Sequence, residues 1–227
     1  MLRNFISLTI LILSTLIMTV TMYLIFIWVP TDDVLGISQR IFYIHVPMGI
    51  LGLMAFPIVF ICSTTYLITK KDTMDSIAYS AAEIGALFLT IALITGMLWS
   101  KPSWGVWWTW SPQPTLTLVS WLVYIAYLML RAYSPRGSQG AKYAAVLGII
   151  GSVNSIFVYL AAKIWRDVHP EAVVGPLAEN DSLDSSMRIG LLIALLAFSL
   201  LFTYLITLRF STRKTEQKIE RLQYEIN

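Results

Sequence analysis

The chain has 227 residues, of which 57% are hydrophobic and only 13% are charged. Because soluble globular domains carry about 25% charged residues, this composition excludes an ordinary soluble domain and predicts a membrane protein. The net charge of +3 is spread over short polar segments and forms no basic stripe, so nucleic acid is not expected as a partner. The single cysteine, Cys62, excludes an internal disulfide and a CxxC redox or metal pair.

Six apolar stretches follow one another, each long enough to cross a hydrocarbon core, which takes about 20 residues. We therefore predict an all-α fold, a polytopic membrane helix bundle that forms a single domain over residues 1–227. The expected transmembrane helices are 5–29, 48–69, 79–99, 115–132, 143–162 and 187–208. The first is longer than a signal-peptide core and lacks a small-residue cleavage site, so we interpret it as a retained span. The charged stretch 209–227 can continue the last helix as a solvated tail or a partner contact.

The distribution of Lys and Arg predicts the orientation, because positively charged loops are retained in the cytoplasm. With both termini inside, the cytoplasmic segments hold eleven basic residues and the outer segments five. The eleven are Arg3, Lys70, Lys71, Arg131, Arg136, Lys142, Arg209, Arg213, Lys214, Lys218 and Arg221, and the five are Arg40, Lys101, Lys163, Arg166 and Arg188. This N-in, C-in topology places segments 30–47, 100–115 and 163–186 on the outer side.

Both histidines of the chain fall in these outer segments. His45 stands where the second span begins, and His169 lies just beyond the fifth; each is followed closely by a proline, which restricts the backbone at the helix boundary. A lone histidine is more often an interfacial side chain with a polar tip. Two on one membrane face can supply the axial ligands of a haem iron, whereas a zinc site would need three or four protein ligands.

Six of the eight tryptophans lie from Trp99 to Trp121, around an outer loop expected at 100–114. Four of them stand within seven residues, which is more than the aromatic belt of a membrane protein requires. These four are Trp104, Trp107, Trp108 and Trp110. If residues 104–108 are helical, the first three share one face and form an aromatic platform that suits a flat macrocycle. The same platform would equally serve to dock a partner protein or lipid.

Two polar residues lie within expected spans. Glu83 is near the cytoplasmic end of the third span, where we expect its carboxylate to extend to the interface, although an embedded acid also suggests a functional role. Asn154, in the fifth span, is expected to bond a neighbouring helix.

Residues 104–110, Trp-Gly-Val-Trp-Trp-Thr-Trp, resemble the tryptophan-rich signature of the haem-handling membrane proteins of cytochrome c maturation. Segment 40–47 before the second span and segment 165–169 after the fifth match in the same order, so the likeness covers nearly the whole chain and is to the CcmC (haem exporter protein C) family. The family usually continues the motif with an aspartate and an arginine, where this sequence has Ser111 and Gln113. Contacts made by that arginine would then shift to Lys101, Arg40 or Arg166.

The resemblance implies that His45 and His169 are the axial ligands of a transiently and non-covalently bound haem b. It implies that Trp104, Trp107, Trp108 and Trp110 cradle this haem on the periplasmic side of the bacterial inner membrane. Members of the family pass haem to the chaperone CcmE and work with the ABC-type CcmA and CcmB subunits and the small membrane protein CcmD. Such a protein is a haem-binding transfer platform more than a classical enzyme.

Two alternatives remain open at this point. An ABC-type permease would move a small solute through the bundle, but no embedded charge pathway or broken helix marks such a route in the sequence. A related cytochrome c synthase, which acts directly on apocytochrome, also carries the tryptophan signature but usually has more spans and more histidines.

Overall fold

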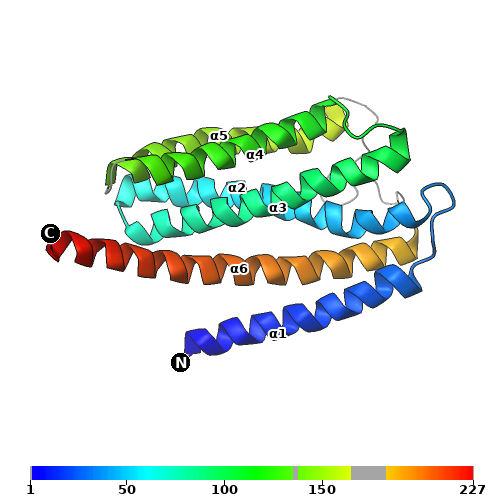
Figure 1. The fold of residues 1–227 in the computed structure, drawn as a ribbon, viewed down its shortest axis with the longest axis horizontal. Helices are drawn as coiled ribbons and strands as arrows, with labels where there is room; N and C mark the ends of the chain where they lie inside the picture. The colour runs from blue at the N-terminus through cyan, green and yellow to red at the C-terminus, as the bar shows by residue number, and fades with distance from the viewer. Residues whose placement is uncertain (1, 135–137, 165–182, 227) are drawn as a thin grey trace.

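The computed structural model describes residues 2–134, 138–164 and 183–226, and within them the protein is built of helices without strands. The six long helices run alternately in opposite directions along one bundle axis (Figure 1). They are α1 (Leu2–Tyr23), α2 (Phe42–Thr69), α3 (Asp72–Trp104), α4 (Pro112–Tyr133), α5 (Ser138–Ile164) and α6 (Ser185–Ile226). All six are long and apolar enough to cross a membrane. The prediction of an all-α, six-span bundle is confirmed.

Most helices extend beyond the apolar stretches from which they were predicted. Helix α2 begins at Phe42, directly after a 3-10 turn over Ile37–Ile41, and α3 begins at Asp72. Two carboxylates, Asp72 and Asp75, lie in the first turn of α3, where they interact favourably with the positive end of the helix dipole. Hydropathy detects only the apolar part of a helix, so it misses such polar ends. The charged segment after residue 208 continues α6 to Ile226, as expected.

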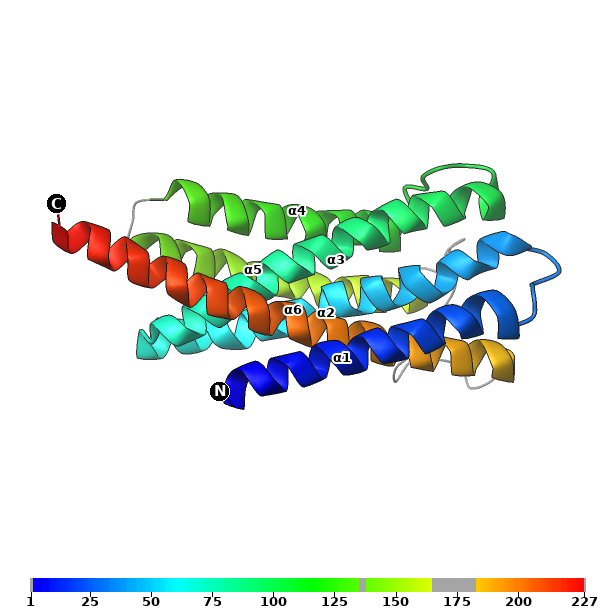
Figure 2. The same cartoon turned by 60° about the horizontal axis from the view of Figure 1, so that its bottom comes forward.

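The bundle is centred on the pair α2 and α3, which pack closely along their length. Small residues permit this approach: a Cβ at Gly85 would fall 2.7 Å from the Cβ of Ala55 and 2.8 Å from the ring of Tyr124. Tyr124 of α4 in turn stacks on Phe56 of α2 with ring centroids 4.0 Å apart. Helices α4 and α5 cover one side of this pair and α6 the other (Figure 1), and α1 lies outermost against α6 (Figure 2).

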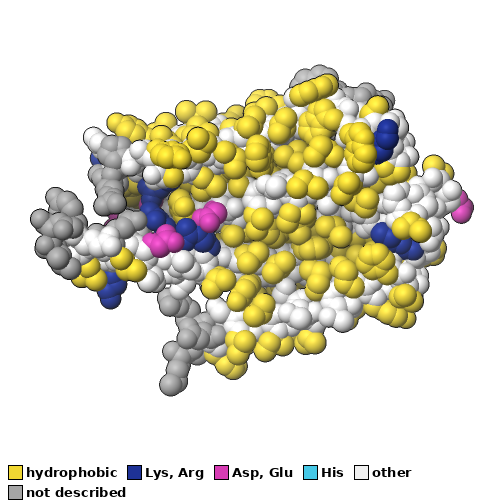
Figure 3. Space-filling model, in the orientation of Figure 1, with side chains coloured by type: hydrophobic (Ala, Val, Ile, Leu, Met, Phe, Trp, Pro, Cys, Tyr) yellow, Lys and Arg dark blue, Asp and Glu magenta, His cyan; other side chains and the backbone are white. Residues whose placement is uncertain are grey.

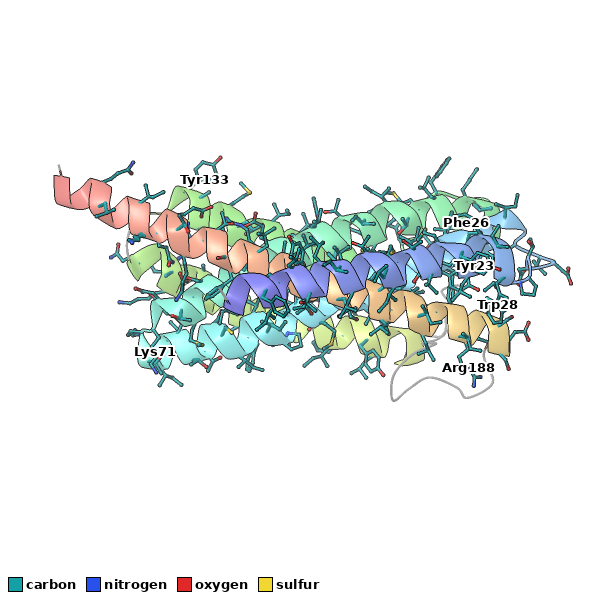
Figure 4. The ribbon with its side chains drawn as sticks, turned by 90° about the horizontal axis from the view of Figure 1, so that it is seen from below. Tyr23, Phe26, Trp28, Lys71, Tyr133 and Arg188 are labelled. Atoms are coloured by element: carbon teal, nitrogen blue, oxygen red, sulfur yellow. The ribbon has the colours of Figure 1, made fainter. Side chains whose placement is uncertain are left out.

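The flank of the bundle is covered with apolar side chains, and the charged ones gather toward its two ends (Figure 3). Trp28 and Arg188 lie at one end, and Lys71 and Tyr133 lie at the other (Figure 4). We call the first the histidine end, formed by residues 29–45, 99–111 and 183–190, and the second the charged end, formed by residues 70–83, 131–134 and 209–217. Segments 29–41 and 105–111 thus lie at the same end of the bundle. This agrees with the prediction that both segments lie on the same side of the membrane.

Candidate functional site

His45 is the fourth residue of α2, and its imidazole is half-buried against α3. Its Nδ1 lies 3.0 Å from the carbonyl oxygen of Ala92 and 3.2 Å from the hydroxyl oxygen of Thr95. The sequence placed this histidine at the start of the second span, and the structure puts it inside α2, three residues before the predicted apolar stretch 48–69. The ring is therefore positioned by a neighbouring helix and not by a loop.

One face of α3 is shaped to receive this ring. Ala92, Gly96 and Trp99 follow one another at i, i+4 and i+7 and so point to the same side of the helix. A Cβ on Gly96 would fall 2.9 Å from Cε1 of His45, so only glycine leaves room for the imidazole at this depth. The ring of Trp99 lies one turn further on, with its centroid 6.1 Å from that of His45.

The tryptophan loop does not form the helical platform predicted from its spacing. Helix α3 ends at Trp104, and Gly105 adopts a left-handed conformation, with φ of 77°, that closes the helix through a hydrogen bond from its N–H to Lys101 O. Glycine takes this conformation without strain because it lacks a Cβ. Residues 105–111 are non-helical, so the condition for Trp104, Trp107 and Trp108 to share one helix face is not met.

The tryptophans instead form two adjacent groups. Trp104 lies 6.0 Å from Trp99, between centroids, and so extends the aromatic wall beside His45. Trp108 and Trp110 form an edge-to-face pair with centroids 5.9 Å apart. The side chains of Trp107 and Trp110 are 56% and 77% exposed. The loop therefore presents aromatic surface both toward the histidine and outward.

Polar contacts tie this loop to the end of α3. The Lys101 ammonium donates to Gly105 O at 2.7 Å and lies 6.0 Å from the ring of Trp107, and the Ser100 hydroxyl donates to Val106 O at 2.8 Å. Arg40, on the same end, donates to Val29 O and to the hydroxyl of Thr31. The two cations thus order the backbone at the histidine end.

Several buried polar atoms at this end have no hydrogen-bond partner among the described residues. They are the indole Nε1 atoms of Trp99 and Trp108, the Gln113 Oε1, the Thr115 hydroxyl and the Tyr43 hydroxyl. Buried polar groups are nearly always paired with protein, water or a ligand, so these atoms are available to a bound molecule. A neutral imidazole for iron, indole faces for a macrocycle and indole N–H donors for carboxylates together match what a haem offers. The residues present therefore fit a haem.

His169 and the neighbouring Trp165 and Arg166 lie outside the described residues. Helix α5 ends at Ile164, five positions before His169, and this end of α5 lies at the histidine end of the bundle (Figure 1). Ser111 and Gln113 stand at the start of α4; Ser111 is its buried N-cap residue and lies 3.2 Å from the Thr109 hydroxyl. The two positions that differ from the usual motif thus lie at the N-terminal end of α4, on either side of Pro112.

Comparison with known proteins gives the family. The sequence model of the CcmC family, described as heme exporter protein C, matches residues 2–225. The chain belongs to the heme exporter protein C family. Its relatives include the Heme exporter protein C of Bradyrhizobium diazoefficiens, 34% identical over 164 residues that make up 72% of this chain and 62% of that protein.

Two further relatives of this heme exporter protein C family member come from a bacterium and a plant. The Heme exporter protein C of Escherichia coli K12 is 31% identical over 176 residues, 77% of this chain and 70% of the relative. A protein of Marchantia polymorpha named as a putative cytochrome c biosynthesis ccmC-like mitochondrial protein is 30% identical over 169 residues, 74% of this chain and 72% of the relative. The chain spans less than two thirds of the Bradyrhizobium protein.

The charged end of this heme exporter protein C family member holds an ion-pair network that the sequence did not predict. Glu83 does not simply extend to the interface; its carboxylate accepts a hydrogen bond from Arg209 of α6 at 2.6 Å. Arg209 also pairs with Glu216, and Asp75 of α3 pairs with Arg131 of α4 at 2.8 Å. These partners are 126 and 56 residues apart in the two cross-helix pairs, so no local signal could have found them.

The prediction for Asn154 is confirmed. Its side-chain amide donates to Leu116 O at 2.9 Å and to the Ser120 hydroxyl at 2.8 Å, both on α4. These two bonds join α5 to α4, as polar side chains commonly do between membrane helices. Asn154 is therefore structural in the described arrangement.

Proposed function

We propose that this protein binds haem as cargo at the histidine end, with His45 and His169 as axial ligands of the iron, and delivers it to the haem chaperone CcmE during cytochrome c maturation. The observation that carries the proposal is the placement of the His45 imidazole against α3, beside Trp99 and at the same end of the bundle as the tryptophan loop. An imidazole held at a wall of indole rings is the arrangement that a haem needs for ligation and for contact with its faces. Membership of the heme exporter protein C family supports the same reading.

The four tryptophans of the loop have distinct roles in this proposal. Trp104 and Trp108 are partly buried and contact the macrocycle from the protein side. Trp107 and Trp110 are largely exposed, so they offer a surface that a haem acceptor can reach. The haem is b-type and non-covalently held, because His45 and the loop supply ligation and stacking and the loop contains no cysteine.

We propose that both termini face the cytoplasm and that the histidine end faces the periplasm of a bacterial inner membrane. The charged end carries Lys70, Lys71, Arg131, Arg209 and Arg213, which is the distribution expected of cytoplasmic loops. The ABC-type CcmA and CcmB subunits and the small membrane protein CcmD are the partners that the family resemblance implies. Beyond the apolar part of α6, the charged helix end offers a cytoplasmic contact surface for them.

The test is an absorption spectrum of the full-length protein purified after haem-replete expression. We expect a low-spin spectrum typical of two imidazole ligands, which His45→Ala and His169→Ala should each disturb. Added imidazole should restore the low-spin spectrum of His45→Ala, which would separate a lost ligand from a damaged fold. A wild-type protein that retains no haem, or two single variants with unchanged spectra, would overturn the proposal.

Delivery is tested separately by co-expression with the haem chaperone. We expect haem-loaded CcmE to accumulate with the wild-type protein and not with His45→Ala or His169→Ala. Equal loading of CcmE in all three strains would show that delivery does not pass through this site.

A further inference from the structure

The two contacts of Nδ1 favour one of the two neutral tautomers of the His45 ring. Nδ1 faces two oxygen atoms, the Ala92 carbonyl at 3.0 Å and the Thr95 hydroxyl at 3.2 Å. A carbonyl oxygen can only accept a hydrogen bond. A ring nitrogen at this distance from it therefore has to carry the proton, because two lone pairs would otherwise face each other.

Thr95 acts as a second acceptor. Its hydroxyl donates back to the carbonyl of Ile91, with the oxygens 2.7 Å apart, and lies 3.2 Å from Ala92 O. Since the single hydroxyl proton is directed at backbone carbonyls of its own helix, an oxygen lone pair remains for Nδ1. Both neighbours of Nδ1 thus accept, and the neutral ring carries its lone pair on Nε2.

Gly96 sets the depth and tilt of the same ring. The atom that a Cβ at this position would meet first is Cε1, which lies between the two ring nitrogens, at 2.9 Å. An added methyl group would have to move the imidazole away from α3 and so lengthen its bonds to Ala92 and Thr95. The glycine therefore permits the geometry that the two acceptors require.

We propose that Ala92, Thr95 and Gly96 of α3 are positioning residues that hold the proton of His45 on Nδ1 and present Nε2 as the nitrogen that binds iron. This inference rests on the proposed function for the identity of the ligand, and on the geometry of α3 for the tautomer. A hydrogen bond from Nδ1–H to an acceptor raises the basicity of the ligand nitrogen, and loss of such a partner typically weakens metal binding about 10- to 100-fold. Thr95→Val removes one acceptor of two, so the smaller effect, about tenfold weaker haem retention, is expected.

The first experiment uses haem-free protein and does not depend on haem binding. Because the chain has two histidines, the His169→Ala background leaves His45 as the single imidazole to observe by nitrogen-15 NMR of histidine-labelled protein in nanodiscs. At about pH 8, where a neutral imidazole predominates, we expect the Nδ1–H tautomer. Thr95→Val and Gly96→Ala should raise the Nε2–H population. Thr95→Ser keeps the hydroxyl group and should therefore show the wild-type pattern.

Gly49→Ala is the matched control, since it adds the same methyl group to α2 near the histidine end and would meet nothing within 4 Å. It should leave the His45 signals unchanged. A wild-type ring in the Nε2–H form, or variants of Thr95 and Gly96 indistinguishable from Gly49→Ala, would overturn the positioning role.

The second experiment uses haem-loaded protein. Relative to wild type and Thr95→Ser, Thr95→Val should retain haem about tenfold less tightly and raise the midpoint potential, because a less basic ligand favours ferrous iron. An unchanged potential in Thr95→Val would overturn the inference. If the wild-type protein bound no haem yet kept the Nδ1–H tautomer, the proposed function would fail while the positioning of the ring by α3 would stand.

Discussion

Asp75→Asn is expected to destabilise the bundle strongly, because it removes one partner of an ion pair enclosed between α3 and α4. Asp75 and Arg131 are 2.8 Å apart, and their side chains are only 6% and 8% exposed. The substitution keeps the volume of the side chain and leaves the guanidinium of Arg131 buried without its counter-charge. Breaking a buried pair in this way costs about 3–5 kcal/mol of the free energy of unfolding.

Glu83→Gln is the matched comparison at the same end of the bundle. Its carboxylate also accepts a hydrogen bond from an arginine, Arg209, but is 38% exposed. Water and salt screen such a pair, so we expect a loss of about 0.2–1 kcal/mol. The difference between the two variants reflects burial and the second carboxylate, Glu216, with which Arg209 remains paired.

The assay is reversible unfolding of the purified protein in mixed detergent micelles, followed by far-ultraviolet circular dichroism as the denaturing detergent fraction rises. The double variant Asp75→Asn with Arg131→Leu should recover most of the lost stability, because replacing both members of a buried pair is often nearly neutral. The reasoning would be refuted if Asp75→Asn lost less than about 1 kcal/mol, or if it matched Glu83→Gln.

Three further results are expected. Gly85→Ala should lower the stability by about 1–3 kcal/mol through its clash with Ala55 and Tyr124, whereas Gly49→Ala, which meets no atom within 4 Å, should raise it slightly in the same unfolding assay. Trp107→Ala should reduce the haem that co-purifies with the protein, while Trp28→Ala, which removes an exposed tryptophan outside the loop, should not; equal spectra would argue against a role for the loop. Replacing Asn154 with leucine should cost about 0.6–2 kcal/mol of stability by removing its two bonds to α4, and an unchanged unfolding curve would contradict that role.

The bounds of the tryptophan loop show where reasoning from sequence was limited. The i, i+3, i+4 spacing of Trp104, Trp107 and Trp108 fits one helix face, yet the helix ends at the first of them. The left-handed Gly105 and the Lys101 ammonium that bonds its carbonyl end the helix at this point. A glycine inside a pattern of helical spacing is compatible with both outcomes, and the contacts around it decide between them.

The partners of the polar groups on α2 and α3 could likewise not be predicted from the sequence. His45 was singled out as a ligand candidate, but its acceptors Ala92 and Thr95 lie 47 and 50 residues away on another helix. Glu83 was expected at the interface, and its arginine stands 126 residues away. The roles of His45 and His169 as iron ligands stay predictions, because His169 lies outside the described residues.

The sequence by itself determined the class of the protein, the number of helices that can cross a membrane and the family. It could do so because a hydrocarbon core imposes a run of about 20 apolar residues on each span, and such runs are visible without any contact. Only the tertiary structure decided which face of α3 meets His45, where α3 ends and which charges pair across helices. These features depend on how each helix is rotated and how it crosses its neighbours, and this is set by side-chain packing between segments far apart in the chain.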